Sequence, residues 1–201
     1  MDIRNHQLSY KALPGLSAAF DPQIYDCPYH EQIGEILMNW VDTNARIQAK
    51  DRTGEYEGGA RMTKFYSGNE RDLKAHDILI DWIESLMVEA ANEFSIWTNS
   101  AYNGSPEESK RFKLADYWGM MYDEGGGTVL HNHWPYALSF GYYLNTPEGS
   151  SPLIVEGQEI QVTEGRLILW PGHMSHEVPD SDVAGRCMIA GNISYAGVVK
   201  W

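Results

Sequence analysis

Beyond residue 112 the chain is a series of short runs rich in β-branched and aromatic residues, separated by Gly, Pro and Asp. About eight strands are expected there, at residues 112–122, 128–133, 137–145, 153–155, 159–162, 165–169, 175–178 and 186–195. Many short strands with turn residues between them are typical of a β-sandwich or a β-barrel. This half of the chain therefore predicts a mainly β architecture.

The first half has a different, helical pattern. A helix is expected at residues 28–50, where apolar residues recur at three- and four-residue spacing: Ile33, Ile36, Leu37, Trp40 and Val41. A second helix is expected from residue 72 or 74 to about 94, a short strand at 61–66, and irregular structure at 1–26. Because the helices precede the strands, they should cover one outer face of the sheets and carry no catalytic group.

Length and composition limit the kinds of protein that this chain can be. The 201 residues fit a single domain, with residues 1–110 as a mostly helical support and 111–201 as the β core. The net charge of −13 opposes binding to nucleic acid, which is not favoured as a partner. No apolar run is long enough to span a bilayer. The chain has only two cysteines, Cys27 and Cys187, so a disulfide framework is not expected. A cytoplasmic location is expected instead.

Two histidines stand close together near a glycine run. His131 and His133 would point to the same face of a strand, where they could supply two nitrogens to one metal ion. A third ligand could be His176, which follows a strand-like run and a Pro171-Gly172 turn. Spacing alone leaves two interpretations open, a metal site and histidines with a structural role.

The order of motifs in the second half narrows this choice. Taken in order, these are Tyr122-x8-His131-x-His133, Tyr142-Tyr143-Leu144-Asn145, Gly165-x5-Pro171-x4-His176 and Arg186. The series, over residues 112–195, resembles the iron(II)/2-oxoglutarate-dependent oxygenases. It is most similar to their prolyl-hydroxylase-like branch and to a related group of small uncharacterised bacterial and phage proteins.

The resemblance implies a double-stranded β-helix, a jelly-roll of the cupin-like kind. It implies Fe(II) held by His131 and His176, with His133 as the third ligand and no catalytic residue beyond the ligands. Arg186 and Tyr143 would hold the distal carboxylate of the cosubstrate 2-oxoglutarate, and Tyr122 would line the pocket. Either tyrosine could instead be a core aromatic residue.

One position departs from the family pattern, which has Asp or Glu where this chain has His133. A third neutral imidazole would leave more positive charge at the site, so another divalent metal stays open. Asp123 or Glu124 could supply a carboxylate, and His133 could lie outside the metal's ligand set. His173 is expected to be a loop residue near the mouth of the barrel.

Three functions fit these residues. The first is a dioxygenase of the hydroxylase type that couples oxidative decarboxylation of 2-oxoglutarate to oxidation of a small-molecule or peptide substrate. The second is a cupin-type three-histidine metalloprotein, although Ala137 and Leu138 occupy the place of the cupin glutamate. The third is a non-catalytic barrel.

Other expectations concern the surroundings of the site. Loops at 51–59, 99–110 and 148–152 are expected to ring the mouth. The oligomeric state stays open, a homodimer included. Trp118, Trp134 and Trp170 are expected in the core.

Overall fold

The computed structural model describes residues 22–48, 59–93 and 112–195. Within them lie two helices, α1 (His30–Asn44) and α2 (Lys74–Glu93). The early strands are short: β1 (Gln23–Asp26), β2 (Ile47–Gln48), β3 (Ala60–Met62) and β4 (Tyr66–Ser67). The later strands are β5 (Phe112–Tyr122), β6 (Gly126–His131), β7 (Leu138–Asn145), β8 (Leu153–Val155), β9 (Gln158–Ile160), β10 (Arg166–Pro171), β11 (His176–Ser181) and β12 (Arg186–Tyr195).

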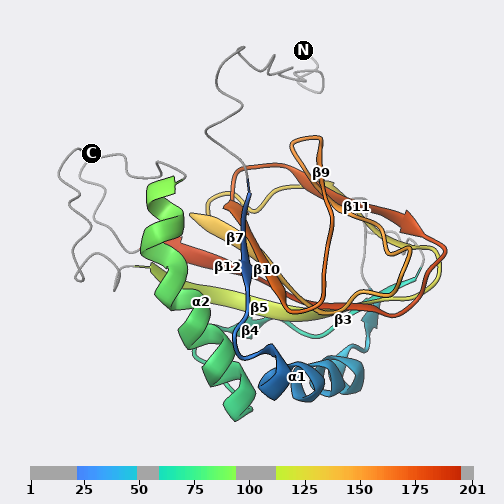
Figure 1. Cartoon of the computed structure of the whole chain (residues 1–201), viewed down its shortest axis with the longest axis horizontal. Coiled ribbons are helices and arrows are strands. Elements are labelled where there is room, and N and C mark those ends of the chain that lie inside the picture. Colours follow the sequence, from blue (N-terminus) through green and yellow to red (C-terminus); the bar gives the residue numbers. More distant parts are fainter. Residues whose placement is uncertain (1–21, 49–58, 94–111, 196–201) are drawn as a thin grey trace, which may run out of the picture.

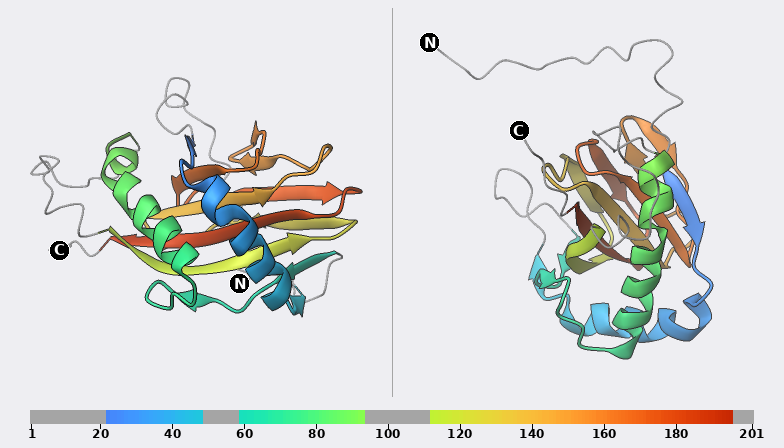
Figure 2. Two further views of the ribbon diagram at one scale, coloured as in Figure 1. Left: turned by 60° about the horizontal axis from the view of Figure 1, so that its bottom comes forward. Right: turned by 90° about the vertical axis from the view of Figure 1, so that its left-hand side faces the viewer.

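The strands form two antiparallel sheets that face each other. The larger sheet has the order β1-β10-β7-β12-β5-β3-β2, with β4 also paired to β5, and the smaller has the order β6-β11-β8-β9. Figure 1 shows both helices on one side of the larger sheet and strands β9 and β11 on the other. In Figure 2, α1 and α2 lie across the outer face of the larger sheet. The predicted fold class, a mainly β jelly-roll with helices packed on one face, is confirmed.

Alternation of side chains along β12 separates two cores. Cys187, Ile189 and Ile193 belong to the core that the larger sheet shares with the helices. Met188 and Ala190 alternate with them and belong to the core between the two sheets. Since side chains two residues apart share a face, the even-numbered residues of β12 point into the space between the sheets.

Helix α1 forms where its apolar spacing predicts. Ile33, Leu37 and Trp40 are buried against the larger sheet, while Ile36 stays 50% exposed on the outer side. The helix ends at Asn44, however, and not at residue 50. Ile47 instead pairs with Met62 in the ladder between β2 and β3, so the end of the predicted helix was wrong.

The first half contributes more strand than the sequence predicted. Residues 23–26 were expected to be irregular but form β1, which pairs with β10 at the edge of the larger sheet. The strand expected at 61–66 is two strands, β3 and β4, which pair with different parts of β5. Each of these strands is at most four residues long, so period-2 alternation has too few positions to reveal it.

A bulge in β5 turns the strand over. Phe112, Leu114 and Tyr117 all face the helix-side core, although a regular strand would change face between 114 and 117. The register between β5 and β12 shifts at the same place, between Asn192 and Ile193. The extra residue on β5 sets Asp116 opposite Asn192.

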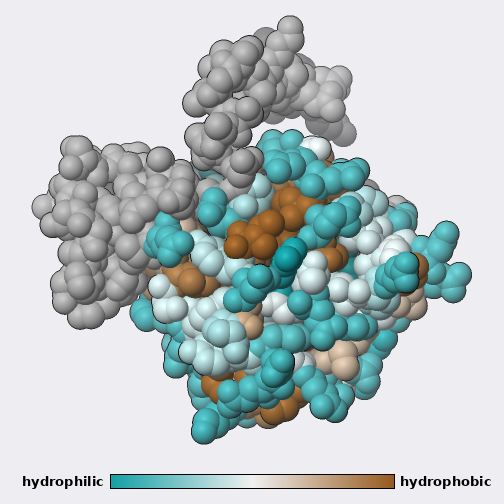
Figure 3. All heavy atoms as spheres, viewed as in Figure 1, coloured by the Kyte–Doolittle hydropathy of each residue, from teal (hydrophilic) through white to brown (hydrophobic). Residues whose placement is uncertain are grey.

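The visible surface is mostly polar. Figure 3 shows the face seen in Figure 1 as mostly hydrophilic, with apolar side chains in separate patches. Neither of the two helices in the described residues has the length and apolar character required to cross a membrane. Cys27 and Cys187 are both buried and free, so no disulfide links them.

A buried histidine behind the larger sheet makes stability depend on pH. His76 is 1% exposed, packs edge-on against Trp40 at 4.5 Å between ring centroids, and has no hydrogen-bond partner among the described residues. Burial lowers its pKa from 6.5 to about 4. The unfolded chain therefore binds a proton between these values that the folded chain excludes, and folding stability falls as the pH drops through this window.

We expect His76→Leu to reduce this acid sensitivity. The loss of unfolding free energy between pH 7 and pH 4.5 should shrink by about 2 kcal/mol relative to the wild type. Urea unfolding of both proteins at the two pH values measures this difference. An equal loss in the two proteins would show that His76 is protonated in the folded state or accessible to water.

Candidate metal centre

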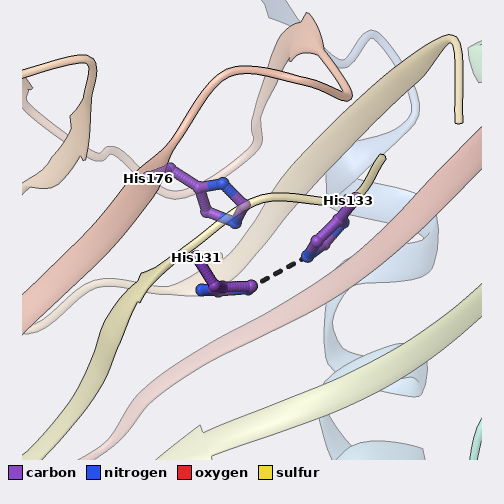
Figure 4. A group of neighbouring side chains, drawn as sticks. All are labelled: His131, His133 and His176. Carbon is purple, nitrogen blue, oxygen red and sulfur yellow. Dashed lines mark hydrogen bonds between the residues drawn. The ribbon is translucent and has the colours of Figure 1, made fainter. Parts of the chain in front are cut away.

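Three histidines converge at one end of the space between the sheets. His131 ends β6 and His176 begins β11, and the two are paired directly across the antiparallel ladder. His133 lies two residues past the end of β6. Figure 4 shows the three rings turned toward one another, with the Nε2 atoms of His131 and His133 3.0 Å apart. One ligand atom from each histidine lies within 4.8 Å of the other two.

Backbone carbonyls orient two of the rings. His131 Nδ1 lies 2.8 Å from the carbonyl oxygen of Val129, and His176 Nδ1 lies 3.4 Å from that of Met174. A carbonyl oxygen can only accept, so each Nδ1 carries the proton. The Nε2 atom of each ring is therefore left with a lone pair that faces the cluster.

A side-chain amide orients the third ring. His133 Nδ1 lies 2.5 Å from Asn192 Oδ1 and 3.0 Å from Ser139 Oγ. The amide cannot be turned the other way, because Asn192 Nδ2 donates to the carboxylate of Asp116 at 2.7 Å. His133 Nδ1 is thus a donor to the amide oxygen, and its Nε2 also presents a lone pair.

This donor set fits a divalent metal ion. Two lone pairs that face each other across 3.0 Å repel unless a cation lies between them. Nitrogens at right angles around a metal, each about 2.1 Å from it, lie about 3.0 Å apart. The geometry of His131 and His133 therefore matches two adjacent positions of an octahedral ion.

Burial keeps the rings of His133 and His176 neutral. It lowers the pKa of His133 to about 4, and the nearby His131 adds to the effect. Burial also lowers the pKa of His176 to about 3, with further contributions from His131 and His133. Because a histidine must be neutral to bind a metal, His133 and His176 are ready to act as ligands at neutral pH.

The glycine run before His131 allows the backbones to pack closely. A Cβ at Gly126 would lie 2.8 Å from the carbonyl oxygen of Gly59, and one at Gly127 would lie 2.8 Å from that of Val178. Only glycine permits such an approach. The approach at Gly127 lets β6 lie close to β11, in the same ladder that pairs His131 with His176.

A buried arginine lies farther into the same space. Arg186 is 2% exposed, donates from Nη1 to the carbonyl oxygen of Ser151 at 2.7 Å, and lies 3.4 Å from the hydroxyl of Tyr143. Its guanidinium also faces the rings of Tyr122 and Tyr143, at 5.1 and 5.3 Å from their centroids. Among the described residues, Arg186 Nε has no hydrogen-bond partner.

A small pocket lies beside the arginine. Its lining includes Arg186, Tyr122, Ser150 and Val178. Val178 follows His176 by two residues and is likewise buried, so it lies about 7 Å deeper along the inner face of β11. The hydroxyl of Ser150 is buried and has no partner within the described part of the chain.

The structure thus brings together the residues singled out in the sequence, with two corrections to the reasoning. His131 and His133 do not share a strand face, because β6 ends at His131. The strand expected at 175–178 is longer than predicted. Strand β11 continues to Ser181, and β11 and β12 belong to opposite sheets.

Other expectations about the site turn out differently. Asp123 pairs with Arg61 at 2.8 Å and does not join the histidine group, nor does Glu124. Trp118 and Trp170 are buried beside His133 and His176, as predicted, but Trp134 is 74% exposed. His173 is exposed. The loop expected at 99–110, and all of 51–59 but its last residue, lie outside the described residues.

Sequence reasoning missed the polar residues behind His133. These are Ser139, Asn192, Asp116 and Tyr136, which bond to one another and to the ring. One signal was available for Asn192, which stands six residues after Arg186 and so on the same face of its strand. No signal was available for Asp116, because its direction depends on the bulge in β5.

Comparison with known proteins gives a clear result for the fold. No protein-family model matches the sequence, and no curated protein matches it. A prolyl-4-hydroxylase from Pseudomonas putida matches with a TM-score of 0.62 and 15% identity, over 90% of this chain and 95% of that one. The chain has the prolyl-hydroxylase fold. The resemblance noted in the sequence is thereby confirmed at the level of the fold.

Two further structures agree. A prolyl hydroxylase from Trichoplax adhaerens, in complex with a peptide fragment of the hypoxia inducible factor oxygen degradation domain, has a TM-score of 0.61 and 14% identity, over 89% of this chain and 84% of that one. The viral collagen prolyl hydroxylase of Paramecium bursaria Chlorella virus-1, in complex with 2-oxoglutarate, has a TM-score of 0.58 and 12% identity, over 88% and 96%.

Proposed function

We propose that the protein is an Fe(II)- and 2-oxoglutarate-dependent dioxygenase of the hydroxylase type. In this proposal His131, His133 and His176 hold the metal, and Arg186 with Tyr143 holds the distal carboxylate of 2-oxoglutarate. The observation that carries the proposal is a buried arginine, without an anionic partner in the described residues, in the same internal space as three converging histidines.

The burial of Arg186 is the first support. A guanidinium keeps its charge at every physiological pH, and removing it from water costs several kcal/mol unless an anion compensates. None of the described carboxylates pairs with Arg186, and its Nε has no acceptor among them. A carboxylate in the adjoining pocket would supply both the missing charge and the missing acceptor.

The spacing between the two groups is the second support. The pocket at Arg186 reaches Val178, the next inward-facing residue after His176. A linear five-carbon dicarboxylate could therefore approach the metal at one end and Arg186 at the other. Tyr143 offers its hydroxyl at the same end as Arg186.

Tyr122 has a supporting part in this proposal. Its hydroxyl already bonds to Thr128 Oγ1 at 2.8 Å, and its ring lies under the guanidinium of Arg186. A cation facing an aromatic ring is attracted to it. Tyr122 would thus line the pocket and hold Arg186 in place, while Tyr143 contacts the carboxylate.

The proposed reaction takes up oxygen and 2-oxoglutarate and gives succinate, carbon dioxide and a hydroxylated product. One oxygen atom enters succinate and the other enters the substrate. Fe(II), when bound, would supply the activation of oxygen. The protein would orient 2-oxoglutarate through Arg186, and Trp118 and Trp170 would exclude water from the side of the ligands.

Three imidazoles in place of two imidazoles and a carboxylate bear on the choice of metal. The ligands are neutral, so a divalent ion would keep its full charge within the ligand set. Other divalent ions that accept nitrogen ligands would compete with Fe(II) at such a site. Metal content should therefore be measured before activity is tested.

The substrate is proposed to be a peptide or a small molecule. The Trichoplax relative in fold is in complex with a peptide fragment. Trp134, which follows His133 in the chain, is 74% exposed and could contact such a substrate. Nucleic acid is not favoured as a substrate because the net charge of the chain is −13.

A cupin-type metalloprotein that does not use 2-oxoglutarate is the alternative. Its support is the ligand set itself, since three histidines are what that class would use. That alternative gives no role to Arg186, whose burial then has no explanation.

Production of succinate distinguishes the two. Purified protein supplied with Fe(II), 2-oxoglutarate and oxygen should form succinate, slowly without substrate and faster when a substrate is present. Omission of any one of the three should stop it. Oxygen uptake that does not depend on 2-oxoglutarate would instead favour the cupin-type alternative.

A further inference from the structure

A chain of hydrogen bonds leads from the histidine cluster to a carboxylate. His133 Nδ1 donates to Asn192 Oδ1 at 2.5 Å, and Asn192 Nδ2 donates to Asp116 Oδ1 at 2.7 Å. The hydroxyl of Tyr136 donates to the other oxygen, Asp116 Oδ2, also at 2.7 Å. Ser139 Oγ lies 3.0 Å from both His133 Nδ1 and Asn192 Oδ1.

We propose that Asp116, acting through Asn192, supplies to the three-histidine centre the negative charge that a carboxylate ligand would otherwise give it. Asp116 and Asn192 are positioning residues in this account, since neither touches the metal. The inference rests on the proposed metal site and deepens it.

Every hydrogen bond in the chain has a fixed direction. A carboxylate can only accept, so Asp116 fixes the amide of Asn192 with its nitrogen toward β5 and its oxygen toward His133. That oxygen in turn fixes the proton of His133 on Nδ1. Reversing any one bond would break the others, so the charge of Asp116 sets the tautomer that exposes Nε2.

Asp116 has no cationic partner among the described residues. Its described partners are the amide of Asn192 and the hydroxyl of Tyr136, both neutral. It forms no ion pair with any described lysine or arginine, although it is only partly exposed. Other acidic residues of the described part, Asp123 among them, are paired with a cation. A metal ion held by His133 would be a cation that is connected to Asp116 through His133 and Asn192.

The position of Asp116 in β5 depends on the bulge in that strand. The register shift between β5 and β12 occurs next to the pair formed by Asn192 and Asp116. Without that bulge Asp116 would point toward the helices, where Leu114 and Tyr117 lie. The backbone of β5 is thus irregular directly before Asp116, the residue that completes the chain of hydrogen bonds.

A relayed carboxylate would raise the affinity of the site for a metal. A carboxylate bonded to the far nitrogen of a metal-binding histidine makes the ring a stronger ligand, and its removal typically lowers metal affinity 10–100-fold. Here an amide stands between the two groups. Bonds in such a chain polarise one another, so part of the effect should pass through the amide.

Exchanging the two side chains tests the inference. Asp116→Asn keeps the shape and removes the charge. The double variant Asp116→Asn with Asn192→Asp moves the carboxylate next to His133. The bond between 116 and 192 then runs from the amide at 116 to the carboxylate at 192, while the bonds from His133 and from Tyr136 keep their direction. Tyr136→Phe is the matched control, since it removes a bond to Asp116 but keeps its charge.

Affinity for Mn(II) is measured by calorimetry on metal-free protein, with thermal unfolding of each metal-free variant beside it. Asp116→Asn should bind Mn(II) about 10-fold more weakly than the wild type. The double variant should recover the wild-type affinity or exceed it, and Tyr136→Phe should lose far less than Asp116→Asn. The unfolding temperatures of the metal-free proteins should not rank the variants in the same order as their Mn(II) affinities.

Two results would overturn the inference while the metal site stands. One is equal Mn(II) affinity in the wild type and Asp116→Asn. The other is a double variant as weak as the single one, because that would make the effect one of packing and not of charge. A wild type that binds no divalent ion would instead refute the metal site on which the inference rests.

Discussion

His131→Ala and His176→Ala are expected to reduce metal affinity by more than about 100-fold, which exceeds the usual effect of residues behind a ligand. These two side chains face each other across the pair β6 and β11, and each presents Nε2 to the same point. Elemental analysis and Mn(II) titration of the purified variants measure the loss. His173→Ala is the matched control, because His173 is exposed and lies only three residues before His176.

The same experiment defines the part played by His133. Its ring is held by Asn192 and Ser139 with Nε2 toward His131, so His133→Ala should also lose the metal. Retention of the metal by His133→Ala, with loss in the other two variants, would place His133 outside the ligand set. Unchanged metal content in both His131→Ala and His176→Ala would refute the site.

Arg186→Ala is expected to weaken 2-oxoglutarate binding by at least about 100-fold, or roughly 2.7 kcal/mol, while metal content stays near that of the wild type. The carboxylate would otherwise be buried opposite Tyr143 with no cation beside it. Arg186→Lys should recover part of the affinity, because lysine restores the positive charge but cannot form the bidentate hydrogen bonds of a guanidinium with a carboxylate. Anaerobic calorimetry with Fe(II) present measures both.

Arg166→Ala controls for the general loss of an arginine. Arg166 begins a strand of the same sheet, but its partner is the exposed Asp26 at the sheet edge. The control should therefore bind 2-oxoglutarate as the wild type does. If Arg186→Ala binds 2-oxoglutarate as tightly as the wild type, the cupin-type alternative becomes the better account.

The sequence predicts the long strands of this fold well, because their patterns have enough positions to be read. Strands β5 and β12 begin and end where the pattern places them, and α2 spans Lys74–Glu93 against a prediction of 72 or 74 to about 94. Strands β1 and β2 were missed, and β3 and β4 were predicted as a single strand, because each is short and becomes a strand only through pairing with a distant part of the chain or with another short strand.

The site shows the same division between local and long-range information. His131, His176 and Arg186 stand at strand ends, and they follow one another in the same order as the matching residues of a known family. The sequence alone is therefore enough to identify them. His133 was expected in the same strand as His131, but it lies two residues beyond the end of β6 and still points toward the other two histidines. Asp116 reaches Asn192 only through a bulge and a contact between residues 76 positions apart, and no local pattern records either.

In the proposed site, the histidine centre and Arg186 hold one 2-oxoglutarate molecule between them. Anaerobic titration of wild-type protein with 2-oxoglutarate, with and without bound Fe(II), tests this most directly. The account predicts one molecule bound per chain when Fe(II) is present, and markedly weaker binding when Fe(II) has been removed. Failure of the Fe(II)-loaded protein to bind 2-oxoglutarate would contradict it, as would an affinity that does not change with the metal.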